Sequence, residues 1–492
     1  MNIEHLTFYI LKNDSTASHA LKYIGVFGGI QGLNLLMGII RNKFTSIFLG
    51  GSGLGLLVIY NSVAEFVSNS TNLGVSFASV RSLSELFETG TEEEVSHAVR
   101  VIRTWCFWTA ILAAVFCICC APLLGSLFAS DEKLQDNWSV ALLAPMVFSM
   151  ALIGGEISIL KGLRRLKRVA TISAVVAASL LITTLPFYSL MHTRGIIIAL
   201  NVSVIVALGI HFCFTLPLYP WRVSPFSLKI MREGWPLVRI GIPFAIAAMT
   251  TAGSTMVLLA LILRLGSQAD VGYYKMGYAI MVSYAGLVLT SMEADYFPRL
   301  SAVNNDIERR NTAMNIQIRA CLMFVAPMLI AMMVMMPWII RILLKEEFLI
   351  INEMAVCAAG FIFFKAIATP IAYIALARGD SLLFLFMELI CNLFSVGLIV
   401  GGYYLLGLTG AGIGLSASSL FDLLLIGICY GIHYHARMET ATWAVIAVQI
   451  IVIGIALAAC LMLPPIGKYS VGAVLLPLSL WQAWRMWKKE HK

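Results

Sequence analysis

The chain has 492 residues, of which 60% are hydrophobic and only 12% are charged, and its formal net charge is +8 at pH 7. About a quarter of the residues in a soluble domain are charged, so this composition excludes an ordinary water-soluble protein. It indicates an integral membrane protein.

Apolar runs recur about every 35 residues along the chain. Each run is close to the ~20 residues that a helix needs to cross the hydrocarbon layer, so the runs predict an all-α fold with about fourteen transmembrane helices. The predicted spans are 22–48, 53–82, 99–129, 138–160, 169–191, 195–217, 237–264, 271–298, 312–340, 350–377, 380–404, 408–432, 441–463 and 470–487.

The segment before the first predicted span, residues 1–21, carries His5, Lys12 and Asp14 among apolar residues. It has no continuous apolar stretch followed by a small-residue cleavage site, so we expect no removable signal peptide. We predict that this segment is an interfacial helix.

The positions of lysine and arginine predict the orientation, because positively charged loops stay in the cytoplasm. With a cytoplasmic N-terminus, most of the 34 lysines and arginines fall on the cytoplasmic side. We therefore expect both termini to be cytoplasmic. The net positive charge reflects this topology, and we expect no nucleic-acid partner.

The first and second halves of the chain resemble each other at a constant offset in residue number. Lys161-Gly162 follows the fourth predicted helix as Arg378-Gly379 follows the tenth, and Gly55 opens the second helix as Gly272 opens the eighth. An even number of helices per repeat gives both halves the same orientation in the membrane. The sequence thus predicts two pseudo-symmetric six-helix lobes around a central cavity.

The predicted boundaries follow from this duplication. They are the interfacial segment 1–21, an N-lobe of residues 22–217, a cytoplasmic linker of residues 218–236, a C-lobe of residues 237–432, and a final helix pair with a tail, residues 433–492.

Two glycine motifs and the cysteines give no sign of a cofactor site. The runs "GGSGLG" at residues 50–55 and "GAGIG" at residues 410–414 lack the lysine of a phosphate-binding loop, so we interpret them as tight turns and close helix packing. The ten cysteines lie in apolar segments and have no metal-ligand spacing, so we expect no metal site.

Polar residues form a stripe along each of the first two predicted helices. Spacings of three and four place them on one helical face, and such a stripe is costly in lipid unless it faces water or protein. The candidate cavity residues are Gln31, Asn34 and Arg41 on the first helix and Asn61, Glu65 and Asn72 on the second. Arg41 is a candidate ligand for the substrate, and an alternative is a structural ion pair with Glu65.

Charged residues also occur in the predicted C-lobe. Lys365 lies in the middle of the tenth helix, whereas Arg264 and Lys275 lie near the outer boundary. All three are candidates for substrate binding, but their position near the outer boundary favours interfacial anchoring for Arg264 and Lys275.

Four acids are candidates for binding a coupling ion. They are Glu65 in the N-lobe, Asp422 in the middle of the twelfth helix, and Glu293 and Asp295 near the end of the eighth, where pairing with Arg299 is an alternative. Glu156 and Glu388 are placed toward the cytoplasmic side without a role.

Several features of the sequence resemble those of a known family. They are the "LGGSGLGL" turn after the first helix, the "YFPRLS" segment that closes the eighth helix, the Lys-Gly and Arg-Gly turns, and the count of six, six and two helices. The chain resembles polysaccharide flippases of the Wzx type. These belong to the multidrug, oligosaccharidyl-lipid and polysaccharide (MOP) exporter superfamily.

The resemblance implies alternating access and a substrate consisting of an oligosaccharide, such as an O-antigen unit, on undecaprenyl pyrophosphate. It also implies translocation from the cytoplasmic to the periplasmic leaflet of the bacterial inner membrane, driven by protons, sodium ions or the membrane potential. Its partners would be membrane lipids, a polysaccharide polymerase and a chain-length regulator.

Two alternatives remain at this stage. One is a cation-coupled multidrug exporter of the same superfamily, and the other is a polytopic membrane enzyme of glycan assembly. The short predicted outer loops leave little room for a catalytic domain, so we expect that the protein is not an enzyme.

Overall fold

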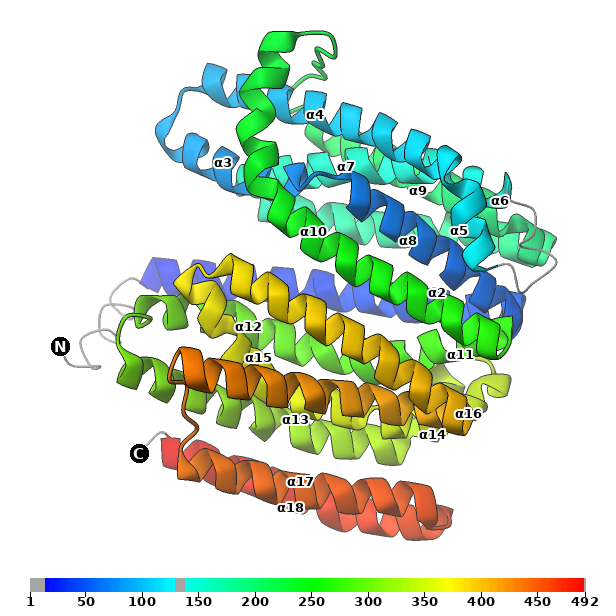
Figure 1. Cartoon of the computed structure of the whole chain (residues 1–492), viewed down its shortest axis with the longest axis vertical. Helices are drawn as coiled ribbons and strands as arrows, with labels where there is room; N and C mark the ends of the chain where they lie inside the picture. The colour runs from blue at the N-terminus through cyan, green and yellow to red at the C-terminus, as the bar shows by residue number, and fades with distance from the viewer. Residues whose placement is uncertain (1–13, 129–137, 491–492) are drawn as a thin grey trace. The chain divides into compact units, whose positions relative to one another are not determined.

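The computed structural model describes residues 14–128 and 138–490, and within these ranges it contains helices and no strand. The helices are drawn in Figure 1. In the first half of the chain they are α2 (Asp14–Thr71), α3 (Val75–Thr89), α4 (Glu92–Cys119), α5 (Ala121–Leu127), α6 (Trp138–Ala141), α7 (Ala144–Gly162), α8 (Leu166–Met191), η1 (His192–Gly195) and α9 (Ile196–Thr215).

The second half continues with longer helices and short irregular turns. They are α10 (Leu228–Leu265), α11 (Gln268–Tyr278), η2 (Ala279–Tyr284), α12 (Ala285–Ala302), α13 (Ile307–Leu343), η3 (Glu346–Ile351), α14 (Asn352–Cys357), α15 (Ala359–Arg378), α16 (Ser381–His433), α17 (Thr440–Met462) and α18 (Pro465–Glu490).

Nine helical ranges in the described part of the chain are long and apolar enough to cross a membrane. Three of them, Gly32–Thr71, Leu166–Thr215 and Leu382–His433, are 40 to 52 residues long, about twice the length of one span. The helical segments 268–302 and 465–490 add two further candidates. The count is therefore compatible with the fourteen predicted spans.

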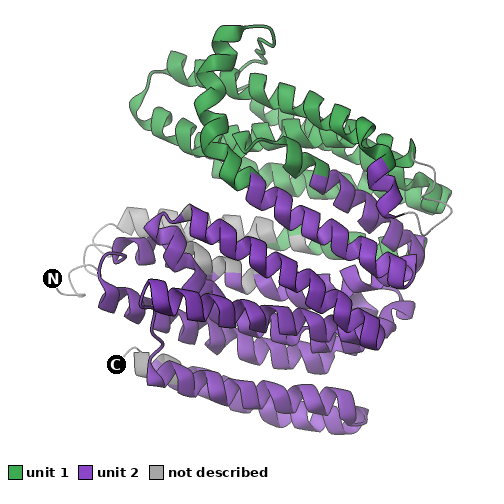
Figure 2. Cartoon of the chain, viewed as in Figure 1, with its two compact units in different colours: residues 1–48, 67–122, 138–245 green, residues 49–66, 123–137, 246–492 purple. Residues whose placement is uncertain are grey.

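The chain divides into two compact units, coloured separately in Figure 2. Unit 1 comprises residues 1–48, 67–122 and 138–245, and unit 2 comprises residues 49–66, 123–137 and 246–492. The lobe boundaries drawn from the sequence stay a prediction.

Several predicted helices differ from the structure in their bounds, and two of these differences are a break and an early start. The second helix does not run unbroken over residues 53–82, because Leu73 and Gly74 adopt left-handed backbone angles (φ 51° and 66°) and a new helix starts at Val75. Helix α10 begins at Leu228, inside the predicted linker, and continues through Pro236. Proline is tolerated in membrane helices because neighbouring groups compensate the lost hydrogen bond.

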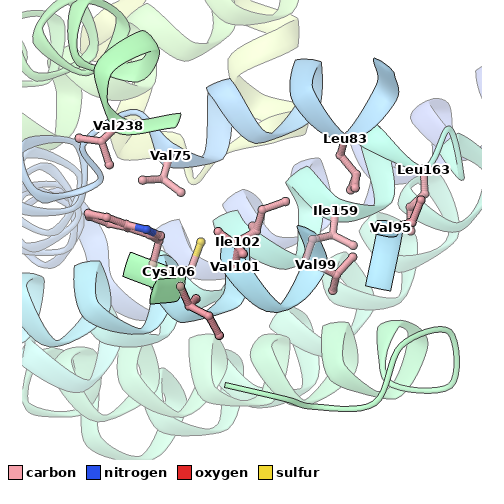
Figure 3. Close-up of a cluster of buried hydrophobic side chains, with 12 residues drawn as sticks. Val75, Leu83, Val95, Val99, Val101, Ile102, Cys106, Ile159, Leu163 and Val238 are labelled. Carbon is pink, nitrogen blue, oxygen red and sulfur yellow. The ribbon is translucent and has the colours of Figure 1, made fainter. Parts of the chain in front are cut away.

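Unit 1 is held together by an apolar cluster between α3, α4, α7 and the start of α10, shown in Figure 3. Beside this cluster lies a buried ion pair. The Arg103 guanidinium donates to both carboxylate oxygens of Glu156, at 2.8 and 2.9 Å, and each side chain is only 2% exposed. Arg103 also donates to the carbonyls of Tyr219 and Pro220, each at 2.9 Å. It thereby fixes the chain that follows α9 to α4 and α7.

Glycines allow α2 and α11 to meet backbone to backbone in unit 2. A Cβ on Gly55 would lie 1.8 Å from the carbonyl oxygen of Gln268, and a Cβ on Gly272 would lie 2.4 Å from that of Gly51. The two contacts are equivalent under the sequence repeat. Gly272 occupies the position in the second half that Gly55 occupies in the first, and Gln268 corresponds to Gly51 in the same way. A two-fold axis between the repeats would produce this pattern. The "GGSGLG" run is thus a close packing motif, as predicted.

In unit 2, α15 packs mainly against α16, and the last two helices, α17 and α18, pack against each other and against α13. Helix α16 is two helical legs joined at Leu406 and Gly407, whose backbone angles are not helical. The legs touch through small residues, since a Cβ on Gly402 would lie 2.2 Å from the Gly410 carbonyl oxygen. Helix α16 is therefore a hairpin.

The buried ion pair predicts that removing one of its charges lowers stability more than removing both. Glu156→Leu leaves the Arg103 charge buried without its partner, so we expect the free energy of unfolding in detergent to fall by about 3–5 kcal/mol. The double variant Arg103→Met with Glu156→Leu should recover most of this loss, because both charges are then removed.

Arg81→Gln is the matched control for this experiment. The Arg81–Glu85 pair is 78% and 68% exposed, and exposed pairs contribute at most about 1 kcal/mol. A loss of stability in Glu156→Leu no larger than in Arg81→Gln would contradict the structural role of the buried pair.

Candidate functional site

Two adjoining cavities inside unit 2 are lined by charged residues. One has a volume of about 280 Å³ and the other about 230 Å³. Four side chains line both of them, namely Lys365, Glu388, Cys391 and Asp422. We call these four side chains the junction residues.

The α16 hairpin brings the two junction acids together. Glu388 precedes the bend at Leu406 on the first leg, and Asp422 follows it on the second at a nearly equal distance along the chain. Legs of nearly equal length return the chain to the same level, about five helical turns from the bend. Helix α15, which packs against α16, adds Lys365 from a third direction.

The charges of the junction compensate one another at a distance. Lys365 and the Cys391 thiol both lie in electrostatic range of the Asp422 carboxylate. The Asp422 Oδ1 atom has no hydrogen-bond partner among the described residues. The Asn392 amide donates to Glu388 Oε1, at 3.4 Å. Because Asp422 keeps an unfilled oxygen, the junction retains capacity to bind a proton, a cation or a polar ligand.

The smaller cavity adds a second lysine and two aromatic rings. Lys275 Nζ lies 5.6 Å from the Tyr278 ring centroid, and Lys365 Nζ lies 5.6 Å from that of Phe361. The two rings are 6.4 Å apart. Each ring lies within cation–π distance of one ammonium group. Lys275 is half-buried and Lys365 is exposed, so the cavity presents two cations beside aromatic faces.

Glu65 of α2 also belongs to this neighbourhood, because it lies in electrostatic range of Lys275. Its side chain is exposed. Unit 2 thus contains four of the predicted site residues. They are Glu65 from the predicted N-lobe and Lys275, Lys365 and Asp422 from the predicted C-lobe.

Other predicted residues have different surroundings. Arg264 donates to the carbonyls of Ser126 and Leu127, at 3.1 and 3.2 Å, and does not line either cavity. Asn61 donates to the Leu57 carbonyl of its own helix, at 2.9 Å. Arg264 thus bonds to the backbone at the end of α5 and Asn61 to its own helix, so both make structural hydrogen bonds.

The remaining candidates of the first two helices lie in unit 1. Arg41 is half-buried and lies in electrostatic range of Tyr188 on α8. Asn34 has a buried Oδ1 without a partner among the described residues, and Asn72 accepts a hydrogen bond from Ser76, at 3.3 Å. The proposed pairing of Arg41 with Glu65 stays a prediction.

The side chains of Gln31, Glu293 and Asp295 lie outside the described residues, so their roles also stay predictions. Sequence reasoning gave Glu388 no role, although a glutamate inside an apolar helix was a usable signal. Among the residues that the structure describes, no group of three or more histidines, cysteines or acids is arranged to hold a metal ion.

Comparisons with known proteins identify a family and a shared fold. The family described as "Polysaccharide biosynthesis protein" matches residues 48–353. No curated protein matches the sequence.

Several solved structures share the fold. The lipid II flippase MurJ in an inward closed conformation is similar with a TM-score of 0.65 and 14% identity, over 92% of this chain and 97% of that one. An inward-facing multidrug resistance MATE family transporter of the MOP superfamily has a TM-score of 0.59 and 16% identity, over 81% of this chain and 95% of that one. A MOP superfamily transporter from Pyrococcus furiosus has a TM-score of 0.53 and 13% identity, over 82% of this chain and 93% of that one. At these identities the similarity shows the fold, which confirms the predicted all-α membrane architecture.

The junction predicts a measurable coupling between Lys365 and Asp422. Lys365→Met should lower the free energy of unfolding, because the acids lose their compensating cation, and Asp422→Asn should partly restore it. We expect a coupling energy of about 0.5–3 kcal/mol from the double-mutant cycle, measured by thermal unfolding in detergent. Lys468→Met is the control, since Lys468 lies on α18 and lines neither cavity. Strictly additive effects of Lys365→Met and Asp422→Asn would contradict the interaction.

Proposed function

This chain belongs to the polysaccharide biosynthesis protein family, and on that premise we propose that it is a flippase for oligosaccharide linked to undecaprenyl pyrophosphate. The membership and the shared fold confirm the expected relation to flippases and transporters of the MOP superfamily. In this proposal the protein moves an O-antigen or other surface polysaccharide unit from the cytoplasmic to the periplasmic leaflet of the bacterial inner membrane, by alternating access. It is a transporter and carries out no covalent chemistry.

The observation that carries the proposal is the pair of ammonium groups in one internal cavity. Lys275 and Lys365 line it together. A pyrophosphate must cross the hydrocarbon layer without its hydration shell, and two cations that line the same cavity compensate that loss. The same cavity is lined by Tyr278, whose hydroxyl offers a hydrogen bond to the phosphate oxygens or to the first sugar.

The size of this cavity limits what it receives. Its volume of about 230 Å³ is below the ~300–1,000 Å³ of pockets that enclose drug-sized molecules. It therefore suits the pyrophosphate end of the substrate and not the whole glycan. Arg41 of unit 1 remains our candidate for a further phosphate contact.

The junction acids suit coupling to an ion gradient. Asp422 and Glu388 line both cavities, and Asp422 Oδ1 is unfilled. Ionisable groups at membrane depth are costly and mark ion or proton pathways. We propose that a proton or a sodium ion binds there during the transport cycle, and that no other cofactor is used.

One observation favours a second function. The two carboxylates of Glu388 and Asp422 in the same cavity would also attract a cationic drug, as expected of a cation-coupled multidrug exporter of the same superfamily. Export of lipid-linked oligosaccharide in a flippase-deficient strain, compared with drug resistance in a susceptible strain, distinguishes the two. Resistance without restored glycan export would replace our proposal with the second one.

The cavity lysines should be required for export. In a flippase-deficient strain that makes a defined repeat unit, we expect Lys275→Met, Lys365→Met and Arg41→Ala each to lower surface glycan at least about tenfold, the effect of losing one charge-assisted contact. Lys468→Met is the control, and membrane levels of every variant are measured by immunoblotting. Normal glycan export by both lysine variants would exclude the cavity as the phosphate site.

The ion dependence of transport should reside in the junction acids. With the protein in vesicles and a lipid-linked oligosaccharide as substrate, we expect Asp422→Asn to remove the stimulation of flipping by an imposed proton or sodium gradient. Glu308→Gln is the control, because Glu308 lies at the start of α13 and lines neither cavity. A gradient response in Asp422→Asn equal to that of the control would place coupling elsewhere.

A further inference from the structure

The last two helices enclose a polar cavity that the transport site does not use. Helices α17 and α18 run side by side (Figure 1) and pack against each other. The cavity between them has a volume of about 320 Å³. Its walls are apolar at Val445 and Val448, but Gln449, Gln482 and Arg485 also line it. The predicted duplication leaves this helix pair without a role, so the polar lining calls for an explanation.

Gln449 is the deepest polar group of this cavity. Its side chain is 1% exposed, and its Nε2 donates to Gln482 Oε1, at 3.2 Å. Its Oε1 has no hydrogen-bond donor among the residues that the structure describes. An unfilled buried acceptor costs about 1–3 kcal/mol. A donor supplied from outside the chain would remove this cost.

Arg485 provides the charge at the mouth of the cavity. It follows Gln482 by three residues, a rise of about 4.5 Å along the helix, and its Cζ lies 5.5 Å from the Trp481 ring centroid. Within the described part of the chain it forms no ion pair. Tryptophan and arginine near a helix end are typical of the level where lipid headgroups meet the hydrocarbon.

We infer that this cavity binds the headgroup of a phosphatidylglycerol molecule. The Arg485 guanidinium donates to the phosphodiester, and a hydroxyl of the headgroup glycerol donates to Gln449 Oε1. Gln482, the hydrogen-bond partner of Gln449, precedes Arg485 by about one helical turn, a separation that a glycerol phosphate spans. The inference is independent of the proposed transport function.

The same chemistry disfavours other lipids. Phosphatidylethanolamine offers a donor for Gln449, but its ammonium group would be held near the Arg485 guanidinium, and like charges repel. Phosphatidic acid supplies the phosphate without a headgroup alcohol, so Gln449 Oε1 would stay unfilled. The cavity should therefore select for a headgroup that combines one negative charge with a hydroxyl.

Lipid binding to the purified full-length protein tests this inference. Phosphatidylglycerol, phosphatidylethanolamine and phosphatidic acid are added separately to the protein in detergent, and bound lipid is counted by mass spectrometry of the intact complex. We expect phosphatidylglycerol to bind about tenfold more tightly than the other two, the effect of one added hydrogen bond or one removed repulsion.

Variants separate the two contacts. Arg485→Gln should weaken phosphatidylglycerol binding at least tenfold, whereas the control Lys488→Gln should not, because Lys488 lies on the same helix but does not line the cavity. Gln449→Met should keep binding of phosphatidic acid and lose the preference for phosphatidylglycerol.

Two results would overturn the inference. One is equal binding of the three lipids by the wild-type protein. The other is equal phosphatidylglycerol binding by Arg485→Gln and Lys488→Gln, which would indicate attraction to the basic tail as a whole. Glycan export measured on the same variants keeps this test separate from that of the transport proposal.

Discussion

The energetic cost of placing charge in an apolar medium is the constraint on which the rest of this structure depends. Two sites among the described residues illustrate how the chain meets it. Arg103 and Glu156 are joined in a two-point ion pair with further carbonyl contacts, so the guanidinium charge is neutralised where it lies. Lys365 and Asp422 instead face cavities, and Asp422 keeps an unfilled oxygen. Full pairing marks a structural role for charge, whereas incomplete pairing beside a cavity marks a functional one.

Much of the fold could be predicted from the sequence, because the length of an apolar run is set by bilayer thickness. The break at Leu73 and Gly74 escapes such a prediction, since apolar and polar periodicity continues across it and only the left-handed backbone interrupts the helix. Helix α10 starts earlier than predicted, because proline inside a membrane helix, here Pro236, does not end it.

The candidate site could be predicted in part. Lys365 and Asp422 stand out because each is an isolated charge in an apolar run, and the structure places both at the junction. Glu388 is likewise an isolated charge in an apolar run, but its position beside Asp422 depends on where α16 bends and how far its legs return. Distances of this kind between residues far apart in sequence are fixed by tertiary packing and leave no periodic signal in the chain.

The bend of α16 has a mechanical consequence. Gly402, Gly410 and Gly414 let the two legs touch along their backbones, so we expect the hairpin to move as one rigid unit. Lys365 belongs to a different helix, α15. A shift of α15 along this hairpin would change the distance from Lys365 to both Glu388 and Asp422. It would leave the distance between the two acids unchanged. A side chain added at one of these glycines would splay the legs, and the acids several turns away would experience a different electrostatic potential without any change of charge.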